Sequence, residues 1–86
     1  MSWDEIRTHN PDRWVLVEAL EAHTDGAHRI IPTLTVIGEY ADYYGGWDEF
    51  KRLHSEDKWR EYYVLHTSRT QLDIGVMDVF RRMVVS

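Results

Sequence analysis

The segment RWVLVEALEAH at residues 13–23 constrains the fold more than any other part of the chain. In an extended strand, neighbouring side chains point to opposite faces. Apolar residues then occupy both faces, with Val15, Val17 and Ala19 on one and Trp14, Leu16 and Leu20 on the other. A strand with two apolar faces belongs inside a sheet that is covered on both sides. We therefore expect an inner strand, at least over the first half of the segment. A helix over residues 18–22 is the alternative for the second half.

A turn and a second strand follow. Thr24-Asp25-Gly26 is typical of a tight turn, because Gly adopts positive φ without steric cost and Asp bonds to the neighbouring backbone. The sequence HRIIPTLTVI at 28–37 is β-branched and alternating, so it predicts a strand that forms a hairpin with the first. Pro32 lacks the N–H that a sheet ladder uses, which places this strand at an edge or marks a bulge.

Two helices are expected, one before the hairpin and one after it. Ser2 and Glu5 have the spacing of a capping box, and Asn10-Pro11 ends a helix, so the first helix spans residues 3–9. In WDEFKRLH at 47–54, apolar residues recur every three positions, and acidic residues precede basic ones as the helix dipole favours. This pattern predicts a main helix of about three turns. An earlier start near Tyr40 is the alternative.

The last third of the chain predicts further strands. REYYVLHT at 60–67 alternates as a third strand, and Leu72–Val85 predicts a fourth, with a helix across 75–83 as the alternative. Because 86 residues form one domain, we expect a single α+β domain over residues 1–86. Its order is α-β-β-α-β-β: a small, mainly antiparallel sheet of three to four strands, one main helix packed on one face, and a short N-terminal helix.

Composition excludes several classes of partner and site. Fifteen acidic and ten basic side chains give a formal net charge of −5. Nucleic-acid binding and attraction to anionic membranes both depend on clustered Lys and Arg, so neither partner is expected. The absence of cysteine excludes disulfides, thiolate metal sites and Cys nucleophiles. The N-terminal sequence lacks the pattern of a signal peptide, and no apolar run approaches the roughly 20 residues of a membrane span. We therefore expect a cytoplasmic protein.

Three segments carry a family resemblance: WVLVEAL at 14–20, LTVIGEY at 34–40 and EYYVLHTSRTQLDI at 61–74. They resemble a family of small bacterial proteins of unknown function that has a WVLIEAL-type first strand and a YVVHTSRE-type third strand. The chain departs from that pattern at Thr70, where the family has Glu. Because the shared motifs lie on predicted strands, the resemblance implies a shared fold and assigns no chemistry.

The histidines are candidate metal ligands: His9, His23, His28, His54 and His66. His23 and His28 flank the predicted turn, with Glu21 and Asp25 nearby. A zinc site needs three or four ligands held close to the ion, and a five-residue separation across a flexible turn matches no metal motif. We therefore expect no metal and no cofactor.

The sequence His66-Thr67-Ser68-Arg69 suggests a nucleophilic hydroxyl, with Asp73 as an orienting acid. Adjacent strand residues point to opposite faces, so His66 and Thr67 do not cooperate easily. Ser68 also lacks the glycines of a nucleophile elbow. We expect Thr67 and Ser68 to end a strand and cap the following turn, and we assign no catalytic residue.

Aromatic residues are abundant, with four Trp, five Tyr and two Phe. If the main helix begins near Tyr40, then Tyr40, Tyr43 or Tyr44, and Trp47 form one stripe. Core packing is one interpretation. The other is that so small a domain cannot bury every ring, so that some form a protein-binding face. The candidate interaction surface comprises Tyr40, Tyr43, Tyr44, Trp47 and Trp59.

These observations favour a non-enzymatic protein-interaction module, either an accessory subunit of another protein or a homodimer. Pairing along an exposed edge strand, 29–37 or the C-terminal one, is an expected docking mode. The alternative is a small ligand-binding or hydrolytic domain that uses histidines and carboxylates. It predicts a pocket in which His66 or His54 meets Asp73 or Glu61.

Overall fold

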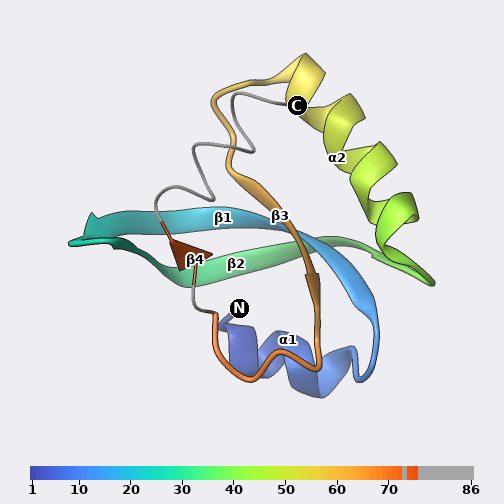
Figure 1. Cartoon of the computed structure of the whole chain (residues 1–86), viewed down its shortest axis with the longest axis horizontal. Coiled ribbons are helices and arrows are strands. Elements are labelled where there is room, and N and C mark those ends of the chain that lie inside the picture. The colour runs from blue at the N-terminus through green and yellow to red at the C-terminus, as the bar shows by residue number, and fades with distance from the viewer. Residues whose placement is uncertain (73, 76–86) are drawn as a thin grey trace.

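The computed structural model describes residues 1–72 and 74–75 and has an α+β fold, as the sequence predicts (Figure 1). The elements in chain order are α1 (Trp3–His9), β1 (Trp14–Asp25), β2 (His28–Tyr40), α2 (Tyr43–Glu56), β3 (Tyr62–His66) and the two-residue β4 (Ile74–Gly75). Neither α1 nor α2, the helices of this described part, has the length and apolar character that crossing a membrane requires.

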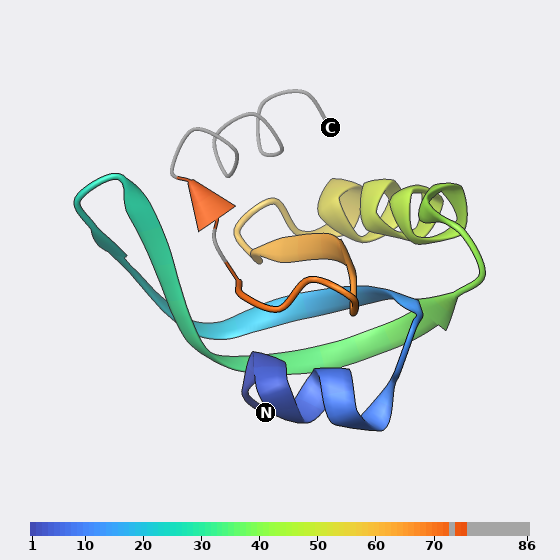
Figure 2. The same cartoon turned by 60° about the horizontal axis from the view of Figure 1, so that its bottom comes forward.

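β1 is an inner strand of the antiparallel sheet, whose order is β3-β1-β2-β4. Val15, Leu16 and Val17 are completely buried, because α1 and α2 cover opposite faces of the sheet (Figure 2). The predicted inner strand with two covered faces is confirmed. Residues 18–22 continue the strand to Asp25, so the alternative of a helix there is wrong.

Each face of the sheet has its own apolar cluster. The cluster on the α1 side contains Trp3, Ile6, Val15, Val17, Ile31, Leu34, Tyr63, Leu65 and Ile74. The cluster on the α2 side contains Leu16, Phe50, Tyr62 and Val64, with half-buried rings around it. Neighbouring residues of β1 and β3 enter different clusters, as strand alternation requires. The predicted main helix on one face is confirmed, and α1 covers the other.

Helix α1 has the predicted bounds and the predicted cap. The Glu5 backbone N–H donates to Ser2 Oγ at 3.3 Å, and the Ser2 backbone N–H donates to Glu5 Oε1 at 3.2 Å. The Ser2 backbone N–H and the Ser2 hydroxyl, which also donates to Glu5 Oε1 at 3.2 Å, favour the ionised carboxylate and lower the pKa of Glu5. Because α1 has only seven residues, it depends on the burial of Trp3 and Ile6 for its stability.

The β1–β2 hairpin turns at Gly26, which has the positive φ of +62°. Glu21 pairs with Thr33 and His23 with Ile30, so β2 has one extra residue beside Pro32. The predicted bulge is therefore confirmed. The strand also continues to Tyr40, three residues past the predicted end at Ile37.

Helix α2 begins at Tyr43, where Asp42 caps it by accepting the Gly45 backbone N–H at 2.9 Å. Tyr40 therefore ends β2 and does not lie on the helix, which corrects the predicted helical stripe of Tyr40, Tyr43 or Tyr44, and Trp47. The helix packs tightly on β3, since a Cβ at Gly46 would approach Val64 Cγ1 to 2.9 Å.

The described C-terminal part ends with β4, which pairs with His28 and Arg29 at the start of β2. The predicted fourth strand over 72–85, and the alternative helix over 75–83, fall mainly on residue 73 and residues 76–86. These positions lie outside the described residues.

Thr67 follows the last residue of β3 and forms hydrogen bonds with the connection between α1 and β1. Its side chain is buried, donates a hydrogen bond to the Asn10 carbonyl oxygen at 2.7 Å and accepts one from the Arg13 backbone N–H at 3.0 Å. The Thr67 backbone N–H also donates to the Arg13 carbonyl at 2.9 Å. The expected role of Thr67 at the end of a strand is confirmed.

We expect Thr67→Val to lower the free energy of unfolding by about 1–3 kcal/mol, because it removes two part-buried hydrogen bonds, to the Asn10 carbonyl and from the Arg13 N–H. Urea unfolding followed by circular dichroism measures this change. Thr67→Ser keeps the hydroxyl and is the matched control. Equal stability of the Val variant and the wild type would contradict the role assigned to the hydroxyl.

Candidate functional site

A row of aromatic contacts runs along α2. Tyr43 stacks on Trp47 with ring centroids 5.9 Å apart, Trp47 stacks on Phe50 at 5.1 Å, and Phe50 stacks on His54 at 5.5 Å. Trp14 of β1 meets Tyr43 edge-on at 5.4 Å. Aromatic pairs of this kind each add about 0.5–1.5 kcal/mol beyond burial, so most of the row serves the fold.

The five residues of the predicted interaction surface divide into two groups. Tyr40, Tyr43 and Trp47 are half-buried and pack against the α2-side cluster. By contrast, Tyr44 is 73 % exposed and Trp59 is 93 % exposed. Tyr44 lies in the first turn of α2, and Trp59 follows the last turn. The rings left in water therefore lie near opposite ends of one helix.

The surroundings of Tyr40 indicate a role in the packing of the fold. Its ring lies against the first turn of α2, next to Gly45 and Gly46. Burial raises the pKa of the Tyr40 phenol, and the nearby Glu49 carboxylate adds to the increase. The phenol therefore stays neutral over the physiological range. Tyr40 therefore packs where the end of β2 leads into the first turn of α2.

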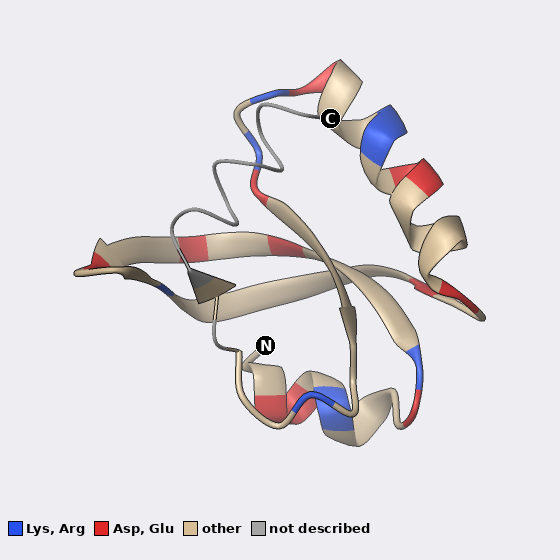
Figure 3. Ribbon diagram, in the orientation of Figure 1, with Lys and Arg blue, Asp and Glu red and all other residues tan. Residues whose placement is uncertain are grey.

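Acidic residues surround Tyr44. Asp42 and Glu39 are exposed just before α2, and the Asp48 side chain is 77 % exposed one turn after Tyr44. Figure 3 shows the acidic segments where β2 runs into α2. Lys51 lies 3.6 Å from Asp48 and offsets part of this charge. An aromatic ring with carboxylates beside it suits a ligand that carries both an apolar and a cationic group.

The turn that carries Trp59 has charges of both signs and is held by ion pairs. Lys58 and Arg60 flank Trp59 in the sequence, with Asp57 and Glu61 one residue further out, and Figure 3 shows basic and acidic segments along this α2–β3 connection. The Trp59 backbone N–H donates to Asp57 Oδ1 at 3.0 Å, and Arg60 Nε lies 3.2 Å from Asp57 Oδ2. Arg60 also approaches Glu18 of β1 at 3.6 Å. Trp59 is thus exposed on a turn whose backbone is ordered by its neighbours.

The predicted nucleophilic segment adopts a local turn. His66 Nδ1 lies 2.8 Å from Ser68 Oγ and also accepts the Ser68 backbone N–H at 3.1 Å. His66 Nε2 lies 3.6 Å from Asp12 Oδ1, so the nearest described acid is Asp12. Sequence reasoning missed Asp12, which reaches His66 from a distant loop position with a φ of +53°. Asp73 lies outside the described residues.

The histidines and carboxylates of the alternative pocket have separate partners. Glu61 binds Arg29 at 2.7 Å and Tyr63 by a hydrogen bond, and it raises the pKa of Arg29. His54 is buried and stacked on Phe50, while His66 meets the ring of Trp14 at 5.1 Å.

The two histidines of the hairpin are exposed, and Asp25 pairs with His28 across the turn. His23 pairs with Ile30, so it is not directly opposite His28. Among the described residues, no group of three or more His, Asp or Glu side chains is placed to hold a metal ion.

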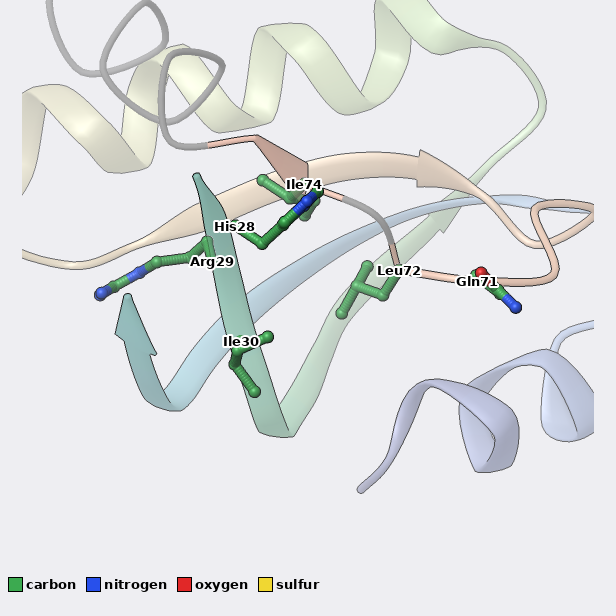
Figure 4. A pocket seen from close by; sticks show the side chains of 6 residues that line it. All are labelled: His28, Arg29, Ile30, Gln71, Leu72 and Ile74. Carbon is green, nitrogen blue, oxygen red and sulfur yellow. The ribbon is translucent and has the colours of Figure 1, made fainter. Parts of the chain in front are cut away.

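A pocket of about 270 Å³ lies between the start of β2 and residues 71, 72 and 74 (Figure 4). Its lining comprises His28, Arg29, Ile30, Gln71, Leu72 and Ile74. Three of these side chains are apolar, and the Arg29 guanidinium already binds Glu61 and Thr24. Polar and apolar atoms contribute about equally to the lining, and the guanidinium among them is already engaged.

The outer edge of β2, a predicted docking edge, is already occupied near its middle. The Met1 ammonium group donates to the Leu34 carbonyl oxygen at 2.7 Å, and the Leu34 backbone N–H donates to the Met1 carbonyl at 2.8 Å. An added strand would have to displace Met1. The exposed rings of Tyr44 and Trp59 need no such displacement, so they form the stronger candidate surface.

Comparison of the chain with protein-family models, with curated proteins and with solved structures gives no match.

We expect Trp59→Ala and Tyr44→Ala each to change the free energy of unfolding by no more than about 0.5 kcal/mol, because both rings are mainly in water. Phe50→Ala is the contrasting variant and should destabilise by about 3–5 kcal/mol, since Phe50 is buried between α2 and the sheet. Urea titration of the three variants tests this. A large loss of stability in Trp59→Ala would show that its ring supports the fold.

Proposed function

We propose that the chain is a non-enzymatic protein-interaction module of the cytoplasm, acting as an accessory subunit or by self-association. The observation that supports this most is the exposure of Tyr44 and Trp59 in a domain whose other described large rings are all buried or half-buried. Tyr and Trp are enriched among the residues that dominate binding energy at protein interfaces.

The setting of the two rings supports the same proposal. Asp57 orders the turn that carries Trp59, because its carboxylate accepts the Trp59 backbone N–H and forms an ion pair with Arg60. The edge of Tyr44 meets the ring of Tyr43 at 5.9 Å, and Tyr43 is itself packed on Trp47. Groups already ordered in the free protein lose less conformational entropy on binding. Both rings can therefore contribute more of their burial energy to affinity.

The charge of the chain limits the classes of partner that fit this proposal. With a net charge of −5, the chain lacks the basic surface that nucleic acid requires, and a protein partner or a second copy fits better. The carboxylates that precede and follow Tyr44 in the sequence favour a partner with basic residues.

We expect the double variant Tyr44→Ser/Trp59→Ser to lose a specific protein partner that the wild type recovers from its native cells. Loss of two exposed anchors should lower recovery by about 30-fold or more. Quantitative mass spectrometry after affinity capture provides the measurement. Leu20→Ser, which changes a 55 % exposed apolar residue of β1, is the control. If all three proteins recover the same partners equally, the two rings are not the docking surface.

A second candidate function is a small ligand-binding or hydrolytic domain, favoured by the alignment of Ser68, His66 and Asp12. Ser68 would attack an acyl carbonyl while His66 Nδ1 takes its proton. Two features place this candidate second. His66 Nδ1 also accepts the Ser68 backbone N–H, and the Asp12 side chain is 94 % exposed, where water weakens its effect on the imidazole.

The leading proposal predicts that Ser68→Ala and the wild type hydrolyse an activated ester such as p-nitrophenyl acetate at the same rate. Release of p-nitrophenolate measures the reaction, and His66→Phe corrects for reaction with the imidazole alone. A loss of about 100-fold or more in both variants would instead favour the hydrolytic function.

A further inference from the structure

The outer edge of β2 has an occupied part and an open part. Met1 bonds to Leu34 through its ammonium group and its carbonyl, and β4 pairs with the first two residues of the strand. Beyond Leu34, the register with β1 shifts, and Ile37 is the extra residue of a bulge. Among the described residues, no backbone group bonds to the outer edge after this bulge (Figure 2). A strand added there leaves Met1 in place.

The ladder between β1 and β3 shows which way the backbone groups of β1 point. In an antiparallel pair, the N–H and C=O of one residue point to the same neighbouring strand, and successive residues alternate. The Ala19 N–H donates to the Glu61 carbonyl, on the β3 side, at 2.8 Å. Even-numbered residues in the first half of β1, such as Leu16 and Trp14, therefore direct their backbone groups toward β2.

The backbone groups of Glu39 consequently point to the open edge. Leu16 and Trp14 pair with Gly38 and Tyr40, whose backbone groups point back to β1. Because Glu39 lies between these two residues, its N–H and C=O point away from β1. The fold leaves this donor and this acceptor available to an added strand.

The side chains along this edge limit the chemistry of the added strand. Ile37 is 41 % exposed, and Glu39 is exposed as well. Within the part of the chain that the structure describes, no cation forms an ion pair with Glu39. A β-branched side chain opposite Ile37 and a cation opposite Glu39 are favourable cross-strand neighbours.

We infer that residues 37–40 of β2 bind an extended segment of another protein, which adds a strand to the sheet and places a Lys or Arg opposite Glu39. Backbone hydrogen bonds give this complex its affinity, and the opposing side chains give it specificity. A second copy of the same edge fits less well, because antiparallel pairing brings two Glu39 carboxylates close together and each chain carries −5. The inference rests on the proposed interaction function and adds a contact of stated chemistry to it.

NMR titration of the isotope-labelled full chain with the acetylated and amidated peptide Thr-Thr-Lys-Thr-Val-Thr tests this contact. In an antiparallel pair, the Lys of the peptide lies opposite Glu39 when its Val lies opposite Ile37. The amide signals of residues 36–40 should shift, with a dissociation constant of about 1 mM. The matched peptide with Glu in place of Lys should bind about 5-fold more weakly or worse.

Three substitutions at one position separate the backbone contact from the charge. Glu39→Ala removes the carboxylate and keeps the N–H, whereas Glu39→Pro removes both, so the Pro variant should bind about 10-fold more weakly than the Ala variant. An outward-facing edge position accepts Pro, because the fold does not use that N–H. Glu39→Lys should prefer the peptide with Glu. Circular dichroism checks that each variant folds, and Glu39→Lys keeps the test decisive if the Pro variant does not.

Several outcomes would overturn the inference. Signals of residues 36–40 that stay unchanged up to about 10 mM peptide exclude strand addition at this edge. Equal affinity of folded Glu39→Ala and Glu39→Pro excludes backbone pairing, and equal affinity for the two peptides excludes the role of Glu39. Shifts of the same signals when the chain alone is concentrated assign the edge to a second copy. If Tyr44→Ser/Trp59→Ser loses a cellular partner while the wild type binds no peptide, the edge contact alone is overturned and the proposed interaction function stands.

Discussion

The burial of β1 on both faces and its pairing on both edges determine the rest of the structure. Val15, Leu16 and Val17 have no exposed surface, since α1 and α2 cover the two faces of the sheet. β1 pairs with β2 along one edge and with β3 along the other, and its alternating side chains enter both apolar clusters. A chain of this size has a thin core. Because both faces of the sheet are covered, consecutive residues in the first half of β1 are all buried, whichever face they point to. Both helices therefore have their positions set by one alternating segment.

Features with a local cause could be predicted from sequence. The Ser2–Glu5 cap fixed the start of α1, and the two-faced pattern of residues 14–17 identified the inner strand. The start of α2 was harder, because the aromatic spacing from Tyr40 to Trp47 fits a helix as well as a strand end followed by a cap at Asp42. Tertiary packing decided that choice, through the close contact of Gly46 with β3.

The candidate site was predictable only in part for the same reason. Aromatic abundance indicated that some rings would stay in water, but periodicity could not say which. Tyr43 and Tyr44 are neighbours, yet one packs on Trp14 and Trp47 while the other is mainly exposed. The approach of Asp12 to His66 is a second example, because it joins a loop residue to the end of β3, far away in the sequence, and depends on the positive φ of Asp12.

Net charge and local charge have different consequences for this chain. A net charge of −5 argues against polyanionic partners, but the charge is uneven along the chain. Carboxylates gather where α2 begins near Tyr44, and the connection that presents Trp59 carries Lys58 and Arg60 together with Asp57 and Glu61. Trp59 makes almost no contribution to burial, whereas Asp57 and Arg60 order the turn beneath it. Ordering a turn restricts its backbone and reduces conformational entropy. An ordered turn beneath a ring that contributes little to the fold is the arrangement that the proposed binding role of Trp59 requires.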